Sequence, residues 1–141
     1  MQQTVRTIWE ARATTEQQVL LAALRAALNP AVPAVPAPQA IDWDSLLSLA
    51  ERHRVLPLLV AGLLDVPALL RDRARAEALR SMMLAGELRH ILSLLKQAGV
   101  TAIPYKGPAL ALQIYGNAAL RQGGDLDLLI APRDLMPARQ P

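Results

Sequence analysis

Two aspartates, Asp125 and Asp127, lie in an otherwise apolar segment near the end of this 141-residue chain. Residues two apart on a β-strand point to the same face, so a strand here directs Leu126, Leu128 and Ile130 toward a core and both carboxylates toward the opposite face. Like charges this close repel each other unless a cation lies between them, and paired carboxylates with substrate phosphates suit Mg²⁺. The pattern predicts a metal-binding strand; the alternative is a solvated edge strand whose charges prevent aggregation.

The composition favours helix in the rest of the molecule. Hydrophobic residues make up 52% of the chain, yet aromatic residues only 3%, and Phe is absent. Alanine and leucine must therefore fill the core, and both favour helix. The net charge of +3 allows a polyanionic partner or a nucleotide without identifying either. No basic block with interleaved aromatic residues is found, so nucleic-acid binding has little direct support.

The sequence also indicates where the protein acts. The absence of cysteine excludes disulfides and thiolate metal sites and fits a reducing compartment. The N-terminal segment carries Arg6, Glu10 and Arg12 without an apolar core, which is unlike a signal peptide. No apolar run approaches the roughly 20 residues that a spanning helix needs. We therefore expect a cytoplasmic protein that has no membrane partner.

The chain divides into four predicted parts. A capping-box pattern at Thr15–Gln18 opens a helix that runs to about Leu28. Four prolines in nine residues then favour an extended linker, and Asp42 is a plausible N-cap for the helix that follows it. The predicted parts are an N-terminal helical arm (1–28), a proline-rich linker (29–40), a helical region (41–98) and a strand–helix–strand segment (99–141).

The last segment has an order that can bind a phosphate. Val100–Tyr105 is short, β-branched and bounded by glycines, which predicts a strand. Lys106-Gly107-Pro108 then opens a helix to about Tyr115, and Gly123-Gly124 leads into the strand 125–130. Glycine lets backbone N–H groups approach a phosphate, the helix N-terminus adds a favourable dipole, and the next strand offers carboxylates for Mg²⁺. The predicted fold class is α+β.

These motifs together resemble a known family. Its signature runs Lys-Gly, a helix with a Tyr, an Arg, and Asp-hydrophobic-Asp, and the matching residues here are Lys106-Gly107, Tyr115, Arg121 and Asp125-Leu126-Asp127. The chain is similar over about residues 40–136 to uncharacterised nucleotidyltransferases of the polymerase β-type superfamily. The stretch Leu49–Leu59 also resembles the helical lead-in of that family. Residues 99–141 are then the first strand–helix–strand portion of a nucleotidyltransferase core.

The resemblance implies a reaction and a site. An acceptor hydroxyl on a small molecule, peptide or nucleic acid attacks the α-phosphorus of an NTP, and pyrophosphate is released. Asp125 and Asp127 are implied to hold two Mg²⁺ ions. Gly107 is implied to allow close backbone approach, and Lys106 and Arg121 to offset the phosphate charge. Lys106 could instead be a surface charge at the turn, and Arg121 could pair with one of the two aspartates.

Two departures from the superfamily pattern matter. Better-known members have Gly-Ser or Gly-Gly at the turn, where this chain has Lys106-Gly107. The superfamily also uses a third carboxylate on a later strand, whereas only Asp134 follows here, and it is better explained as a first-turn helix acid. We therefore expect a truncated enzyme that has little activity alone and self-associates to cover its sheet edge. The alternative is a non-catalytic interaction protein derived from a nucleotidyltransferase domain.

Overall fold

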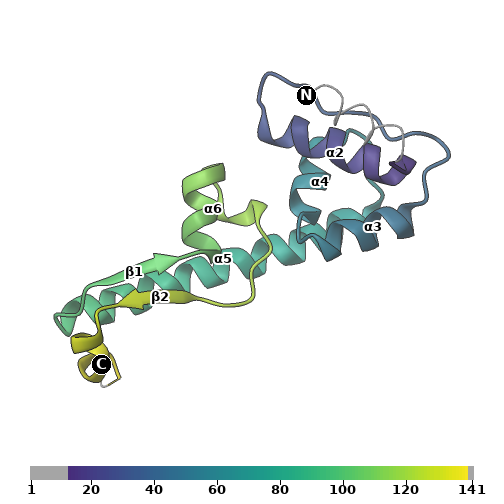
Figure 1. Cartoon of the computed structure of the whole chain (residues 1–141). Coiled ribbons are helices and arrows are strands. Elements are labelled where there is room, and N and C mark those ends of the chain that lie inside the picture. The colour runs from purple at the N-terminus through teal and green to yellow at the C-terminus, as the bar shows by residue number, and fades with distance from the viewer. Residues whose placement is uncertain (1–12, 140–141) are drawn as a thin grey trace. The chain divides into compact units, whose positions relative to one another are not determined.

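Helices account for most of the chain in the computed structural model, which describes residues 13–139. A single two-stranded antiparallel sheet completes the described part, so the predicted α+β class is confirmed. The chain forms two compact units, one ending at Ala74 and the other beginning at Arg75. Helix α5 (Ala68–Gln97) begins in the first unit and continues through the second (Figure 1).

The first unit is built from three helices: α2 (Thr15–Leu28), α3 (Trp43–Arg52) and α4 (Leu56–Gly62). Asp42 caps α3, as predicted, because its carboxylate accepts hydrogen bonds from the N–H groups of Asp44 and Ser45. The capping box of α2 lies one residue earlier than predicted. Thr14 is the N-cap, its hydroxyl accepting from the N–H of Gln17, whose side chain accepts from the N–H of Thr14.

Aliphatic side chains from these three helices, from the start of α5 and from the connecting loops fill the core of this unit. Leu46, Leu56 and Leu59 are among its largest fully buried side chains. Helices α2 and α4 approach so closely that a side chain on Gly62 would overlap the backbone carbonyl of Ala23. The members of this core are Val19, Leu20, Ala23, Ile41, Leu46, Leu47, Ala50, Leu56, Leu59, Leu63, Val66, Leu70 and Ala74.

The proline-rich stretch between α2 and α3 packs onto that core. The N–H of Val35 donates to the carbonyl of Gly62 at 2.9 Å, and the carbonyl of Val35 accepts from the N–H of Leu64 at 3.0 Å. The side chains of Val35 and Ala37 are half-buried against the core. Val35 thus forms an isolated bridge with Leu63, turns occur near both ends of the stretch, and part of its backbone is satisfied at the end of α4.

The second unit begins with the rest of α5, and Gly99 caps the end of this helix. Gly99 has a φ of 73°, in the left-handed region that glycine adopts easily. Its N–H donates to Lys96 at 3.1 Å, and the N–H of Val100 donates to Leu95 at 2.8 Å, which is the Schellman pattern. After it come β1 (Ala102–Tyr105), α6 (Gly107–Tyr115), the 3₁₀ turn η1 (Ala118–Leu120), β2 (Asp127–Ile130), η2 (Pro132–Asp134) and α7 (Leu135–Ala138).

The two strands run antiparallel although a helix separates them in sequence. Tyr105 lies opposite Asp127, Pro104 opposite Leu128, Ile103 opposite Leu129 and Ala102 opposite Ile130. Partners in such a ladder share a face. One face carries half-buried Ala102, Pro104, Leu128 and Ile130, and the other carries Ile103, Tyr105, Asp127 and Leu129. The alternation predicted for residues 127–130 is thus present.

Candidate functional site

The turn between β1 and α6 is held in an unusual backbone conformation at Lys106. This residue has φ 71° and ψ −156°, a combination that is essentially restricted to glycine. Its carbonyl accepts a hydrogen bond from the N–H of Leu110 at 3.2 Å, which begins α6. No side chain caps this end of the helix, so the first-turn amide of Gly107 and the helix dipole are available to an anion.

Lys106 lies next to the acidic strand. Its Nζ is 3.8 Å from Oδ2 of Asp127, and the two side chains are 53% and 42% exposed. The same ammonium lies 5.0 Å from the centroid of the Tyr105 ring. Because Tyr105 lies opposite Asp127 in the ladder, the three side chains form one group on the exposed face of the sheet.

Gly107 brings the turn against the segment that precedes β2. A Cβ atom at this position would be 3.3 Å from the carbonyl oxygen of Asp125, and the residue has a φ of 50°. Asp125 lies outside β2, although the sequence predicted a strand from residue 125. The ladder begins at Asp127 because β1 ends at its partner Tyr105, after which the chain turns into α6. Asp125 is therefore an exposed residue just before the strand.

Arg121 is positioned through its backbone. Its carbonyl accepts a hydrogen bond from Oγ of Ser81 at 2.7 Å, and Ser81 is only 2% exposed on α5. Among residues 13–139 the Arg121 guanidinium has no ion-pair partner, so the alternative pairing with Asp125 or Asp127 is not formed. Tyr115, the last residue of α6, is half-buried.

Tyr105, which the sequence motifs do not single out, also lies beside the candidate site. It is 53% exposed and stands with Ile103 and Leu129, which are 62% and 55% exposed, on the face that carries Asp127. These three side chains form an exposed, largely apolar surface next to Lys106 and Asp127. The signal was present in the sequence, because Tyr105 directly precedes Lys106-Gly107, but placing it beside Asp127 requires the strand register.

The donor chemistry of the site fits Mg²⁺ bound together with a nucleotide. In the described part of the chain no three His, Cys, Asp or Glu residues gather into a metal-binding cluster. Mg²⁺ does not need one, since it commonly binds through one or two carboxylates plus substrate phosphates. Asp125 and Asp127 provide two carboxylates, and neither accepts a hydrogen bond from a neighbouring residue in the described chain.

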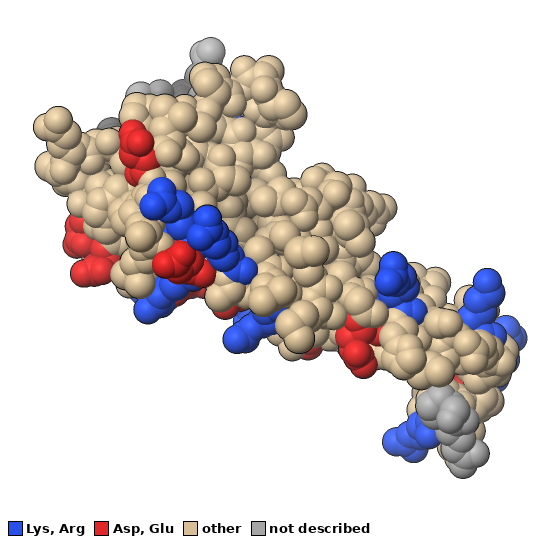
Figure 2. All heavy atoms as spheres, turned by 180° about the vertical axis from the view of Figure 1, so that it is seen from behind, with Lys and Arg blue, Asp and Glu red and all other residues tan. Residues whose placement is uncertain are grey.

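The charged side chains on one face of the described chain are mixed in sign. On the face shown in Figure 2, basic and acidic side chains are interspersed and no broad patch of one sign is visible. Nonspecific binding to nucleic acid rests on such a basic patch or stripe. Within residues 13–139, no helix combines the length and the hydropathy that a membrane span requires.

Comparison with known proteins identifies one family. No curated protein and no solved structure matches the chain. One family profile, described as uncharacterised nucleotidyltransferase, matches residues 39–140, which is most of the chain and includes every residue of the site. The resemblance noted from the Lys-Gly and Asp-x-Asp motifs is thereby confirmed, and the chain belongs to the family of uncharacterised nucleotidyltransferases.

Proposed function

We propose that this protein transfers an NMP group from an NTP to a hydroxyl of an acceptor. The acceptor oxygen forms a bond to the α-phosphorus, the bond from that phosphorus to the bridging oxygen breaks, pyrophosphate leaves, and the hydroxyl proton passes to a base or to water. The observation that carries the proposal is the convergence of two motifs. The Lys106-Gly107 turn meets Asp127 through an ion pair and Asp125 through a backbone contact.

The turn supplies the phosphate contacts in this proposal. The uncapped N-terminus of α6 presents the Gly107 amide, and the positive end of the helix dipole favours an anion there. Lys106 lies beside the same helix end, so its ammonium can exchange Asp127 for a phosphate oxygen. Arg121, which has no ion-pair partner among residues 13–139, is assigned to the distal phosphates.

Asp125 and Asp127 are the residues that would hold Mg²⁺. When bound, the metal offsets phosphate charge and favours departure of pyrophosphate. A complete superfamily site also has a third carboxylate, and no third acid joins this pair among the described residues. We propose that this carboxylate comes from outside residues 13–139, from a further segment or a second copy, and that the described residues form the nucleotide-binding half of the site.

Calorimetric titration tests the metal assignment. Each MgNTP is titrated into wild-type protein, into the double variant Asp125→Asn/Asp127→Asn, and into Asp134→Asn as a control. Asp134 is a matched control because it is an acid of the same segment that pairs with Arg133 and lies outside the site. We expect binding heat in wild type and control, and its loss in the double variant. Equal heats in all three proteins would contradict the proposal.

Pyrophosphate release tests the need for a third carboxylate. With mixed NTPs and Mg²⁺, we expect little turnover from the chain alone, because no base beyond the metal-binding pair is in place for the acceptor hydroxyl. Rapid turnover that Asp127→Ala abolishes would show that the site is already complete.

A further inference from the structure

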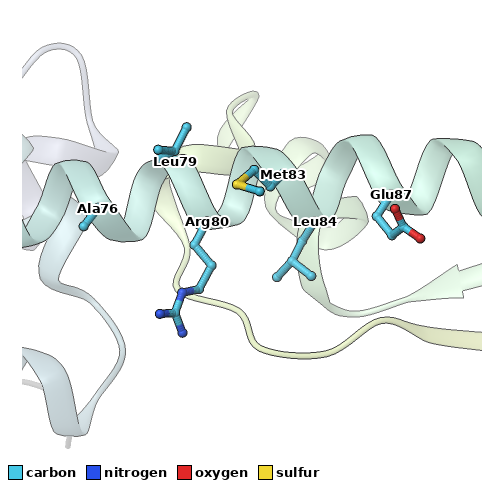
Figure 3. Close-up of a pocket in the computed structure, with 6 residues that line it drawn as sticks. All are labelled: Ala76, Leu79, Arg80, Met83, Leu84 and Glu87. Atoms are coloured by element: carbon cyan, nitrogen blue, oxygen red, sulfur yellow. The ribbon is translucent and has the colours of Figure 1, made fainter.

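Helix α5 carries an open groove on its exposed side within the second unit. Six residues of the helix line it, and its volume is about 520 Å³ (Figure 3). Two of them, Leu79 and Met83, are 62% and 69% exposed. With Leu84 they form an apolar strip along the helix, and a contiguous exposed apolar patch is a candidate interaction surface. The lining residues, which we call the α5 groove, are Ala76, Leu79, Arg80, Met83, Leu84 and Glu87.

The groove contains one charge of each sign. Arg80 and Glu87 are exposed, and neither has an ion-pair partner among the residues that the structure describes. They are seven residues apart, so their backbones are separated by roughly 10 Å along the helix axis. Side chains on one helix interact at spacings of three or four residues, which excludes direct pairing between these two. The groove thus has an apolar centre with one unpaired charge at each end, Arg80 at one and Glu87 at the other.

We propose that a second copy of this chain binds the α5 groove, with the two α5 helices antiparallel about a two-fold axis. The midpoint between Arg80 and Glu87 is also the midpoint between Met83 and Leu84. A two-fold axis through that point places Arg80 of each copy opposite Glu87 of the other, and brings Met83 and Leu84 of both copies close to the axis. The surface is therefore complementary to itself, as a two-fold interface requires.

The charge pattern selects this arrangement over a parallel one. In a parallel pair aligned in register, Arg80 would face Arg80 and Glu87 would face Glu87, and like charges at close range disfavour a pairing. The apolar part of the groove covers only about three turns of helix. An interface of this size belongs to the small, weak class, so we expect a dissociation constant on the order of micromolar.

Charge reversal tests the proposal through sedimentation of the full chain over about 1 to 500 µM, a range that spans the expected dissociation constant. Arg80→Glu and Glu87→Arg each place like charges opposite one another at two symmetry-related positions, so each should weaken the dimer by about tenfold or more. The double variant restores opposite charges across the axis and should return the dissociation constant to within about threefold of wild type. Circular dichroism of each variant verifies that α5 remains helical.

Cross-linking tests the orientation, and the absence of cysteine from the chain makes it simple. In Met83→Cys the thiols lie close to the axis and should form a disulfide dimer under mild oxidation. In Ala76→Cys the two thiols are separated by roughly 20 Å in the antiparallel pair, so no disulfide dimer should form. A wild-type chain that stays monomeric throughout, a double variant as weak as the single ones, or equal cross-linking at both positions overturns the proposal. A monomer would mean that another part of the protein or a different partner covers the groove.

Discussion

Replacing Lys106 by glycine should make the protein more stable and a weaker nucleotide binder. Lys106 occupies a backbone conformation that is essentially restricted to glycine, with φ 71° and ψ −156°. Such a conformation costs an L-residue about 1–3 kcal/mol, which glycine does not incur. Residues strained in this way cluster at active sites and ligand clamps, and the ammonium of Lys106 lies beside Asp127.

Two smaller effects oppose the gain in stability. Glycine loses more backbone entropy on folding, by about 0.5–1 kcal/mol. The ion pair with Asp127 is lost, but at 3.8 Å, with side chains 53% and 42% exposed, it contributes less than about 1 kcal/mol. The net result for Lys106→Gly is a stabilisation of about 1 kcal/mol, or roughly 3–5 °C in melting temperature.

Lys106→Met is the matched variant, because it removes the charge and keeps the strained backbone. Lys106→Met should be slightly less stable than wild type. The free energy of unfolding of Lys106→Gly should therefore be about 1–2 kcal/mol higher than that of Lys106→Met. Chemical denaturation measures the free energy of unfolding, and calorimetry measures MgNTP binding for all three proteins. Both variants should bind nucleotide more weakly. A glycine variant no more stable than the methionine variant would refute the claim of strain, and unchanged nucleotide affinity would refute the phosphate role.

Three further predictions concern stability. Gly62→Ala should destabilise the first unit by about 2 kcal/mol or more, because the new methyl group would overlap the backbone carbonyl of Ala23. Gly86→Ala should stabilise the protein by up to about 1 kcal/mol, since a Cβ atom here would meet nothing outside its own helix turn within 4 Å and alanine is the better helix former. Hydrogen bonds from the side chain and N–H of Ser45 hold the pKa of Asp42 below its usual value of 3.8. The stability that the Asp42 carboxylate provides is therefore fully present above pH 3.8, and it is lost as the pH falls through the lowered pKa. Asp42→Asn keeps a capping group that does not titrate, and should lose less stability than wild type on acidification.

Chemical denaturation curves measure the free energy of unfolding for all three variants, and for Asp42→Asn they are repeated at a series of pH values. A Gly62→Ala protein as stable as Gly86→Ala would show that α2 and α4 are not in close contact. Parallel acid-unfolding curves for wild type and Asp42→Asn would remove Asp42 from the pH dependence.

The helical boundaries were predictable because they depend on local chemistry. Asp42, Gly99 and Gly116 end or begin helices through their own side chains or their freedom to adopt positive φ, and each acts where its position in the sequence indicates. The one-residue error at the start of α2 arose because Thr14 and Thr15 are both suitable caps. Each has a glutamine three residues later, Gln17 or Gln18, and only the structure shows that Thr14 and Gln17 form the capping box.

The arrangement of the site was predictable only in part. Two motifs, Lys106-Gly107 and the pair Asp125 and Asp127, were identified from residue types and spacing. They are separate in the sequence, and the structure brings them together. Three features depend on long-range pairing and were not accessible: the antiparallel register, the exclusion of Asp125 from the strand, and the place of Tyr105 beside Asp127. The glycine-like backbone of Lys106 could not be predicted either, because a lysine at that position favours negative φ.

The antiparallel pairing of β1 and β2 leaves Asp127 on a strand that is paired on one side only within residues 13–139. A ladder can grow at such an edge without any change in the residues already paired. A strand added alongside β2 would bring a side chain on the same face to about 5 Å from Asp127, the spacing of cross-strand neighbours. A single acidic residue at that register would convert a two-carboxylate site into a three-carboxylate one. Under the proposed function, strand addition alone would complete the site without moving any residue assigned to the nucleotide.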